Sequence, residues 1–146
     1  MNITFYLVAL SIVVGLTSYA GYLIFKLRIQ QKLRSQKIQY RIDNISESIQ
    51  TIAKALDQQQ CNLSEGCIRL FHLLEAIPVK DKPDFSQQFR GLYSLYEQVK
   101  DFPTHDVRKL QSKRETKHQD LQREEIEAQL ESQILNDVLV LKTFTV

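Results

Sequence analysis

Four side chains in this sequence have the chemistry for metal binding or thiol redox work: Cys61, Cys67, His72 and His105. A structural zinc site needs a second close pair of Cys or His ligands, and no such pair follows at the usual spacing. Redox pairs usually have two residues between their cysteines, but five separate Cys61 from Cys67. His72 and Glu75 share one helical face once, whereas di-iron bundles repeat a Glu-x-x-His motif. We therefore expect no cofactor and keep a metal or redox protein as the alternative hypothesis.

Motifs of catalysis and of nucleic-acid binding are missing from the sequence. It has no Gly-rich phosphate loop, no Gly-x-Ser-x-Gly and no Cys/His/Asn set that can be placed. Residues 42–146 carry 13 basic and 17 acidic side chains, and the basic positions lack interleaved aromatic residues. We expect neither an enzyme with a small-molecule substrate nor a nucleic-acid-binding protein.

The elements that must position these side chains begin with an apolar segment at residues 3–25. It carries no formal charge, whereas all 19 basic and 17 acidic side chains follow it. As a helix it would be about 35 Å long, enough to cross a hydrocarbon core of about 30 Å. Tyrosines lie toward its two ends, where aromatic rings favour the membrane interface. We predict a transmembrane anchor over residues 1–25.

A cleaved signal peptide is the rival interpretation of the same segment. Residues 18–20 form a small-x-small triplet that a signal peptidase could cleave. However, no Lys or Arg precedes the apolar run, which continues through Phe25. The missing basic n-region favours an uncleaved anchor.

A basic flank follows the apolar segment, with no acidic residue among its charges. Such a flank predicts a cytoplasmic body and a short N-terminus outside, and it also lies where anionic lipid head groups can be contacted. The flank consists of Lys26, Arg28, Lys32, Arg34, Lys37 and Arg41.

A heptad stripe marks the next helix, which with the flank makes up residues 26–60. Its apolar positions alternate in steps of four and three, the spacing of a helix that packs against another helix. No Gly or Pro interrupts this region, so we expect the anchor to continue into a helical stalk. The stripe consists of Ile38, Ile42, Ile45, Ile49, Ile52 and Leu56.

Three further helices are predicted in residues 61–146. One starts at Asn62, with Glu65 reaching back to the cap, and stops before Pro78. A second starts at Asp84 and ends near residue 102. A third is expected to start at Thr104 and to extend as far as residue 141, with a solvated middle and a docked end. The fold class is therefore all-α: an N-terminal transmembrane helix, a helical stalk and a small bundle packed with residues 38–60, ending in a long C-terminal helix.

The last predicted helix carries two blocks of opposite charge. Residues 108–118 have a net charge of +4 and residues 119–131 a net charge of −4. Such blocks can pair two helices antiparallel, within one chain or between copies, or they can form a solvated face.

Residues 63–69 (LSEGCIR) and 103–105 (PTH) resemble a bacterial domain-of-unknown-function family of small, N-terminally anchored helical membrane proteins. The resemblance implies a bacterial inner membrane and brings no activity with it.

We predict that these two segments meet in space. Gly66 would allow close helix approach, and Glu65 and Arg69 would form an ion pair beside Thr104 or His105. A corner of helix caps and packing explains the same residues without a ligand. The candidate interaction or packing corner consists of Glu65, Gly66, Cys67, Arg69, Thr104 and His105.

The sequence thus favours a single-pass inner-membrane protein with a cytoplasmic helical body that binds a protein partner or a second copy. Its mechanism would be tethering, because the anchor fixes the location of a helical surface. Membrane lipid is the other expected partner.

Overall fold

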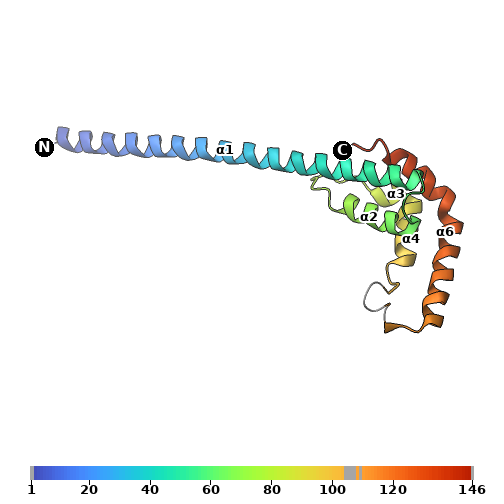
Figure 1. The fold of residues 1–146 in the computed structure, drawn as a ribbon. Helices are drawn as coiled ribbons and strands as arrows, with labels where there is room; N and C mark the ends of the chain where they lie inside the picture. Colours follow the sequence, from blue (N-terminus) through green and yellow to red (C-terminus); the bar gives the residue numbers. More distant parts are fainter. Residues whose placement is uncertain (1, 104–107, 109, 146) are drawn as a thin grey trace. The chain divides into compact units, whose positions relative to one another are not determined.

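A computed structural model describes residues 2–103, 108 and 110–145, and it confirms the all-α class. A long apolar N-terminal helix is followed by a small helical bundle that ends in a C-terminal helix (Figure 1). The described helices are α1 (Asn2–Asp57), α2 (Leu63–Glu75), α3 (Phe85–Gln88), α4 (Arg90–Val99) and α6 (Lys113–Leu141).

The chain divides into two compact units, residues 1–40 and residues 41–146. The apolar side chains that the structure describes in the first unit are exposed to solvent. Within the described part of the chain, α1 holds the one segment long and apolar enough to cross a membrane. That finding rests on length and composition, a test that a signal sequence near an N-terminus also passes.

The heptad stripe of α1 packs into the core of the second unit. Ile45, Ile49 and Leu56 are buried, as the spacing predicts. Ala53 is also fully buried, although its small side chain stands outside the six-residue stripe. The stripe is therefore used within the chain from Ile45 to Leu56, whereas Ile38, in the first unit, is 38% exposed. Ile42 and Ile52 are partly buried.

Helix α2 begins where the capping pattern predicts. The side chain of Asn62 accepts a hydrogen bond from the backbone N–H of Ser64. Glu65 does not follow the predicted capping box, because its carboxylate accepts from Arg69 one turn later. The helix ends at Glu75, before Pro78 can interrupt it.

The helix predicted from Asp84 to residue 102 is two helices, α3 and α4. Asp84 caps α3 as expected, accepting from the backbone N–H groups of Ser86 and Gln87. The break falls at Phe89, whose φ of −118° and ψ of 62° lie outside the helical region. The ring of Phe89 is buried and packs against the ring of Phe85, and the helix is interrupted at this buried residue.

The last helix is shorter than predicted, because α6 starts at Lys113. Ser112 and Glu115 form a reciprocal capping box that fixes this start. Thr104, the predicted cap, lies outside the described residues. The docked end is confirmed, since the buried positions that the structure gives for α6 all lie between Ile134 and Leu141.

Helix α4 packs closely against α6 at Gly91 (Figure 1). A Cβ atom at Gly91 would lie 2.8 Å from the backbone carbonyl carbon of Gln133. Beside this contact, Asp137 accepts a hydrogen bond of 3.0 Å from the backbone N–H of Leu92. Phe89 supplies no side-chain cap, so α6 provides the acceptor that the first turn of α4 lacks.

Helix α2 receives a carboxylate from α6 in the same way. Glu127 accepts hydrogen bonds from both the backbone N–H and the hydroxyl of Ser64. Ser64 is buried, so its hydroxyl needs a partner, and Glu127 provides it while sharing the N–H with the cap residue Asn62. The carboxylate also suits the positive end of the helix dipole.

We expect Gly91→Ala to destabilise the protein by about 1–3 kcal/mol, because backbone atoms of α6 occupy the space for the added methyl group. In an open helix the same change would stabilise by up to about 1 kcal/mol. Urea unfolding of the full chain in detergent micelles, followed by circular dichroism, measures the effect. Gln98→Ala, at an exposed position of α4, is the matched control. An unchanged or higher stability of Gly91→Ala would contradict the packing.

We expect Asp137→Ala to lower the free energy of unfolding by about 1–2 kcal/mol, the usual loss for a helix cap. Glu131→Ala, which removes an exposed acid from the same helix, should change it by less than about 0.5 kcal/mol. Equal effects of the two substitutions would show that Asp137 does not cap α4.

The capping carboxyl also predicts a pH dependence of stability. Burial raises the pKa of Asp137 above its ordinary value of 3.8, so between the two pKa values the folded state binds more protons than the unfolded state. The contribution of Asp137 to stability should therefore fall as the pH rises through its folded-state pKa, opposite in sign to the contributions of carboxyls such as Glu75, whose pKa is lowered in the fold. The difference in unfolding free energy between the wild type and Asp137→Asn, measured across the acidic range, should show this decrease.

Candidate functional site

A groove in the second unit runs between the start of α2, the end of α4 and the first turns of α6. We call it the arginine groove, and its volume is about 590 Å³. It is lined by Asn62, Ser64, Glu65, Ile68, Arg69, Val99, Phe102, Pro103, Arg108 and Arg123.

One wall of the arginine groove is the exposed edge of α2. Arg69 donates to Glu65 over 2.5 Å, which confirms the predicted ion pair. The side chains remain 64% and 59% exposed, so water screens the pair and it contributes little to stability. A ligand can therefore compete for Arg69 at small cost.

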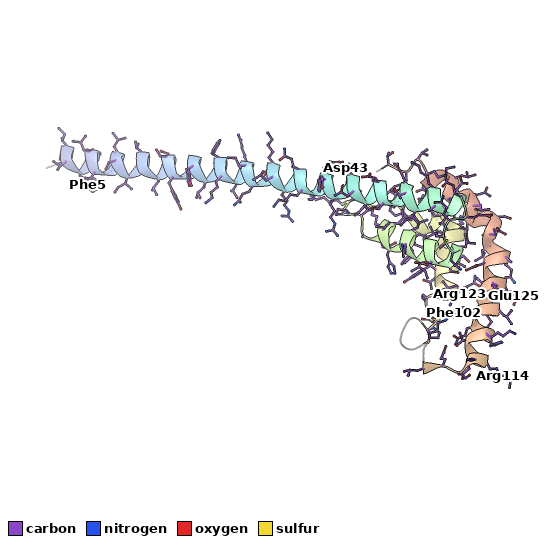
Figure 2. All side chains as sticks on the ribbon, viewed as in Figure 1. Phe5, Asp43, Phe102, Arg114, Arg123 and Glu125 are labelled. Carbon is purple, nitrogen blue, oxygen red and sulfur yellow. The ribbon has the colours of Figure 1, made fainter. Side chains whose placement is uncertain are left out.

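The opposite wall holds two arginines that share one carboxylate. One guanidinium nitrogen of Arg108 donates to both carboxylate oxygens of Asp120, over 2.7 and 2.8 Å. Arg123 comes within 3.9 Å of the same carboxylate, too far for a good hydrogen bond. Its guanidinium stands 5.7 Å from the ring centre of Phe102, and the two residues lie side by side in Figure 2.

The lining residues give the arginine groove a positive balance. Three arginines face one glutamate there, and Asp120 compensates one further charge behind the wall. The ring of Phe102 holds Arg123 in place through a cation–π contact. The floor is apolar at Ile68 and Val99.

The predicted corner residues divide between this groove and the core. Glu65 and Arg69 line the groove, as does Pro103 from the second predicted segment. Cys67 is fully buried, and a Cβ at Gly66 would lie 2.5 Å from Leu56 Cδ2. Close approach at Gly66 is thus present. Thr104 and His105 lie outside the described residues.

A second, smaller pocket borders Cys61, on the acidic side of α6. Its volume is about 300 Å³, and Glu124, Glu127 and Glu131 contribute to its wall. Among the residues that the structure describes, no group of three or more His, Cys, Asp or Glu side chains is arranged to hold a metal ion. The metal alternative has no described site.

The thiol alternative meets an electrostatic obstacle at Cys67. Cys61 and Cys67 are free, and Cys67 is fully buried. Burial, with help from the charges of Glu127 and Asp137, raises the pKa of Cys67 to about 12. The thiolate is the reactive form, so this thiol stays inert at neutral pH.

His72 and Glu75, the other predicted ligand pair, have separate surroundings. His72 is exposed and contacts the rings of Phe71 and Tyr96 edge-on. Glu75 accepts hydrogen bonds from Lys82 and from the Tyr93 hydroxyl, each of 2.6 Å. These hydrogen bonds lower the pKa of Glu75 and tie α2 to the connector and to α4.

The six residues of the basic flank are exposed along α1. They fall into two groups on opposite sides of the helix, because a turn of about 100° per residue places residues 26, 34, 37 and 41 within about 80° of one another and residues 28 and 32 on the other side.

Sequence reasoning missed the groove's second wall, formed by Phe102, Arg108 and Arg123. A single helix from residue 104 onward places these charges on a solvated face or in a pairing block. The signal in the sequence is the capping box of Ser112 and Glu115, which starts a helix between Arg108 and Asp120.

These features define a small all-α protein with one long apolar N-terminal helix and a basic groove on its helical bundle. Residues 13–141 match the family described as "Protein of unknown function (DUF2489)", and the chain belongs to that family. A Haemophilus influenzae protein named "Uncharacterized protein" is 40% identical over 137 residues, covering 94% of this chain and 90% of the relative. Membership of a domain-of-unknown-function family, which residues 63–69 and 103–105 indicated, is thus confirmed. No solved structure matches the chain.

We expect the two cysteines to react very differently with a maleimide in the folded full chain. Cys61, which borders a pocket, should be labelled within minutes, whereas Cys67 should be labelled only after unfolding. Single-cysteine variants, Cys61→Ser and Cys67→Ser, separate the two reactions by mass spectrometry. Fast labelling of Cys67 at pH 7 would revive the redox hypothesis.

Proposed function

We propose that this chain is a single-pass protein of the bacterial inner membrane, with its N-terminus outside and its helical bundle in the cytoplasm. The observation that supports it most is the uncharged apolar part of α1, exposed along its length and followed by six basic residues. Exposed apolar side chains in water are costly, and a lipid environment removes that cost.

The charge distribution supports the orientation. Cytoplasmic flanks of membrane helices carry an excess of Lys and Arg, and here no acid lies among residues 26–41. The same flank would contact anionic lipid head groups, at about 1 kcal/mol for each charge close to the surface.

We infer that the bundle serves as a tether or protein-interaction module. Two points support a binding role over a catalytic one. The described residues include no metal-ligand cluster, and the buried thiol is inert. The arginine groove, in contrast, presents charged side chains held by weak, exchangeable ion pairs. The partner is a second protein or another copy of this chain.

Topology and processing test the proposal. A compartment-sensitive reporter fused after residue 146 should be active in the cytoplasm, and mass spectrometry of the membrane fraction should show residues 1–20 retained. Reversing the basic flank with Lys26→Glu, Arg28→Glu and Lys32→Glu should weaken this orientation. The matched control replaces Lys80, Lys100 and Lys113, exposed bases far along the chain. A body outside the cytoplasm, or loss of residues 1–20, contradicts the anchor.

Cross-linking in intact membranes tests the interaction role. The full chain should cross-link reproducibly to one protein species, which is either a second copy or a different partner. A chain that stays monomeric and cross-links to no defined species contradicts the tether.

A further inference from the structure

We propose that the arginine groove binds an acidic peptide segment of a partner protein, one that carries Asp or Glu next to an apolar side chain. The inference rests on the proposed interaction function and names the chemistry of the partner. It uses the three lining arginines, Arg69, Arg108 and Arg123.

Charge is the first argument. Residues 42–146 have an excess of acidic side chains, yet the described lining of this groove has three arginines against one glutamate, with Asp120 behind two of the arginines. The acidic remainder of the unit repels an acidic partner, whereas the arginines of the groove attract it. This charge contrast directs an acidic partner to the groove.

The incomplete pairing of Arg123 is the second argument. Among the described residues its ion-pair partner is Asp120, which already accepts two hydrogen bonds from Arg108. The Arg123 side chain is only 25% exposed and stands over the ring of Phe102. A guanidinium that stands over a ring, with no close acceptor among the residues that the structure describes, is well placed to receive a carboxylate, which it can bind through two parallel hydrogen bonds.

The apolar lining is the third argument, and it distinguishes a peptide from a free anion. Ile68, Val99 and Phe102 face the same groove as the arginines. A small inorganic anion would leave this surface wet, whereas a peptide can place a leucine or phenylalanine on it. A nucleic acid is less suitable, since its continuous row of phosphates would extend beyond the groove onto the acidic rest of the unit, whereas a short peptide can confine its acids to the groove.

Fluorescence anisotropy with the full chain in detergent micelles tests the proposal. The probe is a labelled synthetic peptide that alternates Glu with Leu, and its counterpart has Gln in place of Glu. The Glu peptide should bind and weaken with added salt, while the Gln peptide should bind at least about tenfold more weakly. Arg69→Gln together with Arg123→Gln should weaken binding of the Glu peptide about tenfold.

Arg90→Gln is the matched control, because it removes an exposed arginine at the opposite end of α4. Arg69→Gln alone keeps the test valid if Arg123→Gln disturbs folding, since Arg69 is on the surface. Equal weakening by Arg90→Gln, or no effect of the groove substitutions, overturns the proposal. Displacement of the peptide by inorganic phosphate or by a single-stranded oligonucleotide at equal charge also overturns it, because the groove would then be a general anion site.

The membrane cross-link separates this inference from the function on which it rests. A partner that cross-links equally to the wild type and to the groove variant overturns the groove and leaves the tether in place. A partner that depends on Arg69 and Arg123 supports both.

Discussion

The bundle depends on α6 as the common support of the two helices that define the groove. Its carboxylates, Glu127 and Asp137, reach the first turns of α2 and α4 about 15 Å apart along one helix. Asp137 supplies the acceptor that the first turn of α4 lacks, and Glu127 adds an acceptor for Ser64, whose N–H Asn62 already caps. Because one rigid helix provides both acceptors, the starts of α2 and α4 are held in register with it. The close contact at Gly91 then fixes how deeply α4 can settle against α6.

Much of this fold follows from local patterns in the sequence. The stripe of α1 and the caps at Asn62 and Asp84 come from spacing and from polar side chains near the backbone they serve. The break at Phe89 could not be predicted in this way, because its cause is the burial of an aromatic ring among residues distant in sequence. The carboxylates of α6 are also long-range partners of the helices they cap. A lone acid on an amphipathic helix gives no local sign of such a role.

In the candidate site, too, some contacts can be predicted from residues close in sequence and others cannot. The ion pair of Glu65 and Arg69 is predictable, since the two residues are one helical turn apart. The wall of Arg108, Asp120 and Arg123 required knowledge of where α6 starts, because Ser112 turns the chain so that Arg108 faces back toward Asp120. With a continuous helix, the same charges would be distributed along a solvated face. The start of one helix therefore decides whether these arginines line a groove.

Most of the α1 stripe is buried in the core, so this face of the helix offers little surface to a partner. Ile45, Ile49 and Leu56 are buried, so the strongest apolar pattern of the sequence already has its partner in the same chain. The ion pairs of the arginine groove are exposed or half-buried, and a single ion pair of this kind contributes little free energy. A groove of this kind suits a tethered protein, because confinement to one membrane raises the effective concentration of a partner in that membrane. In the proposed function, weak, salt-sensitive contacts would then be sufficient, and the anchor and the groove would act as two parts of one binding mechanism.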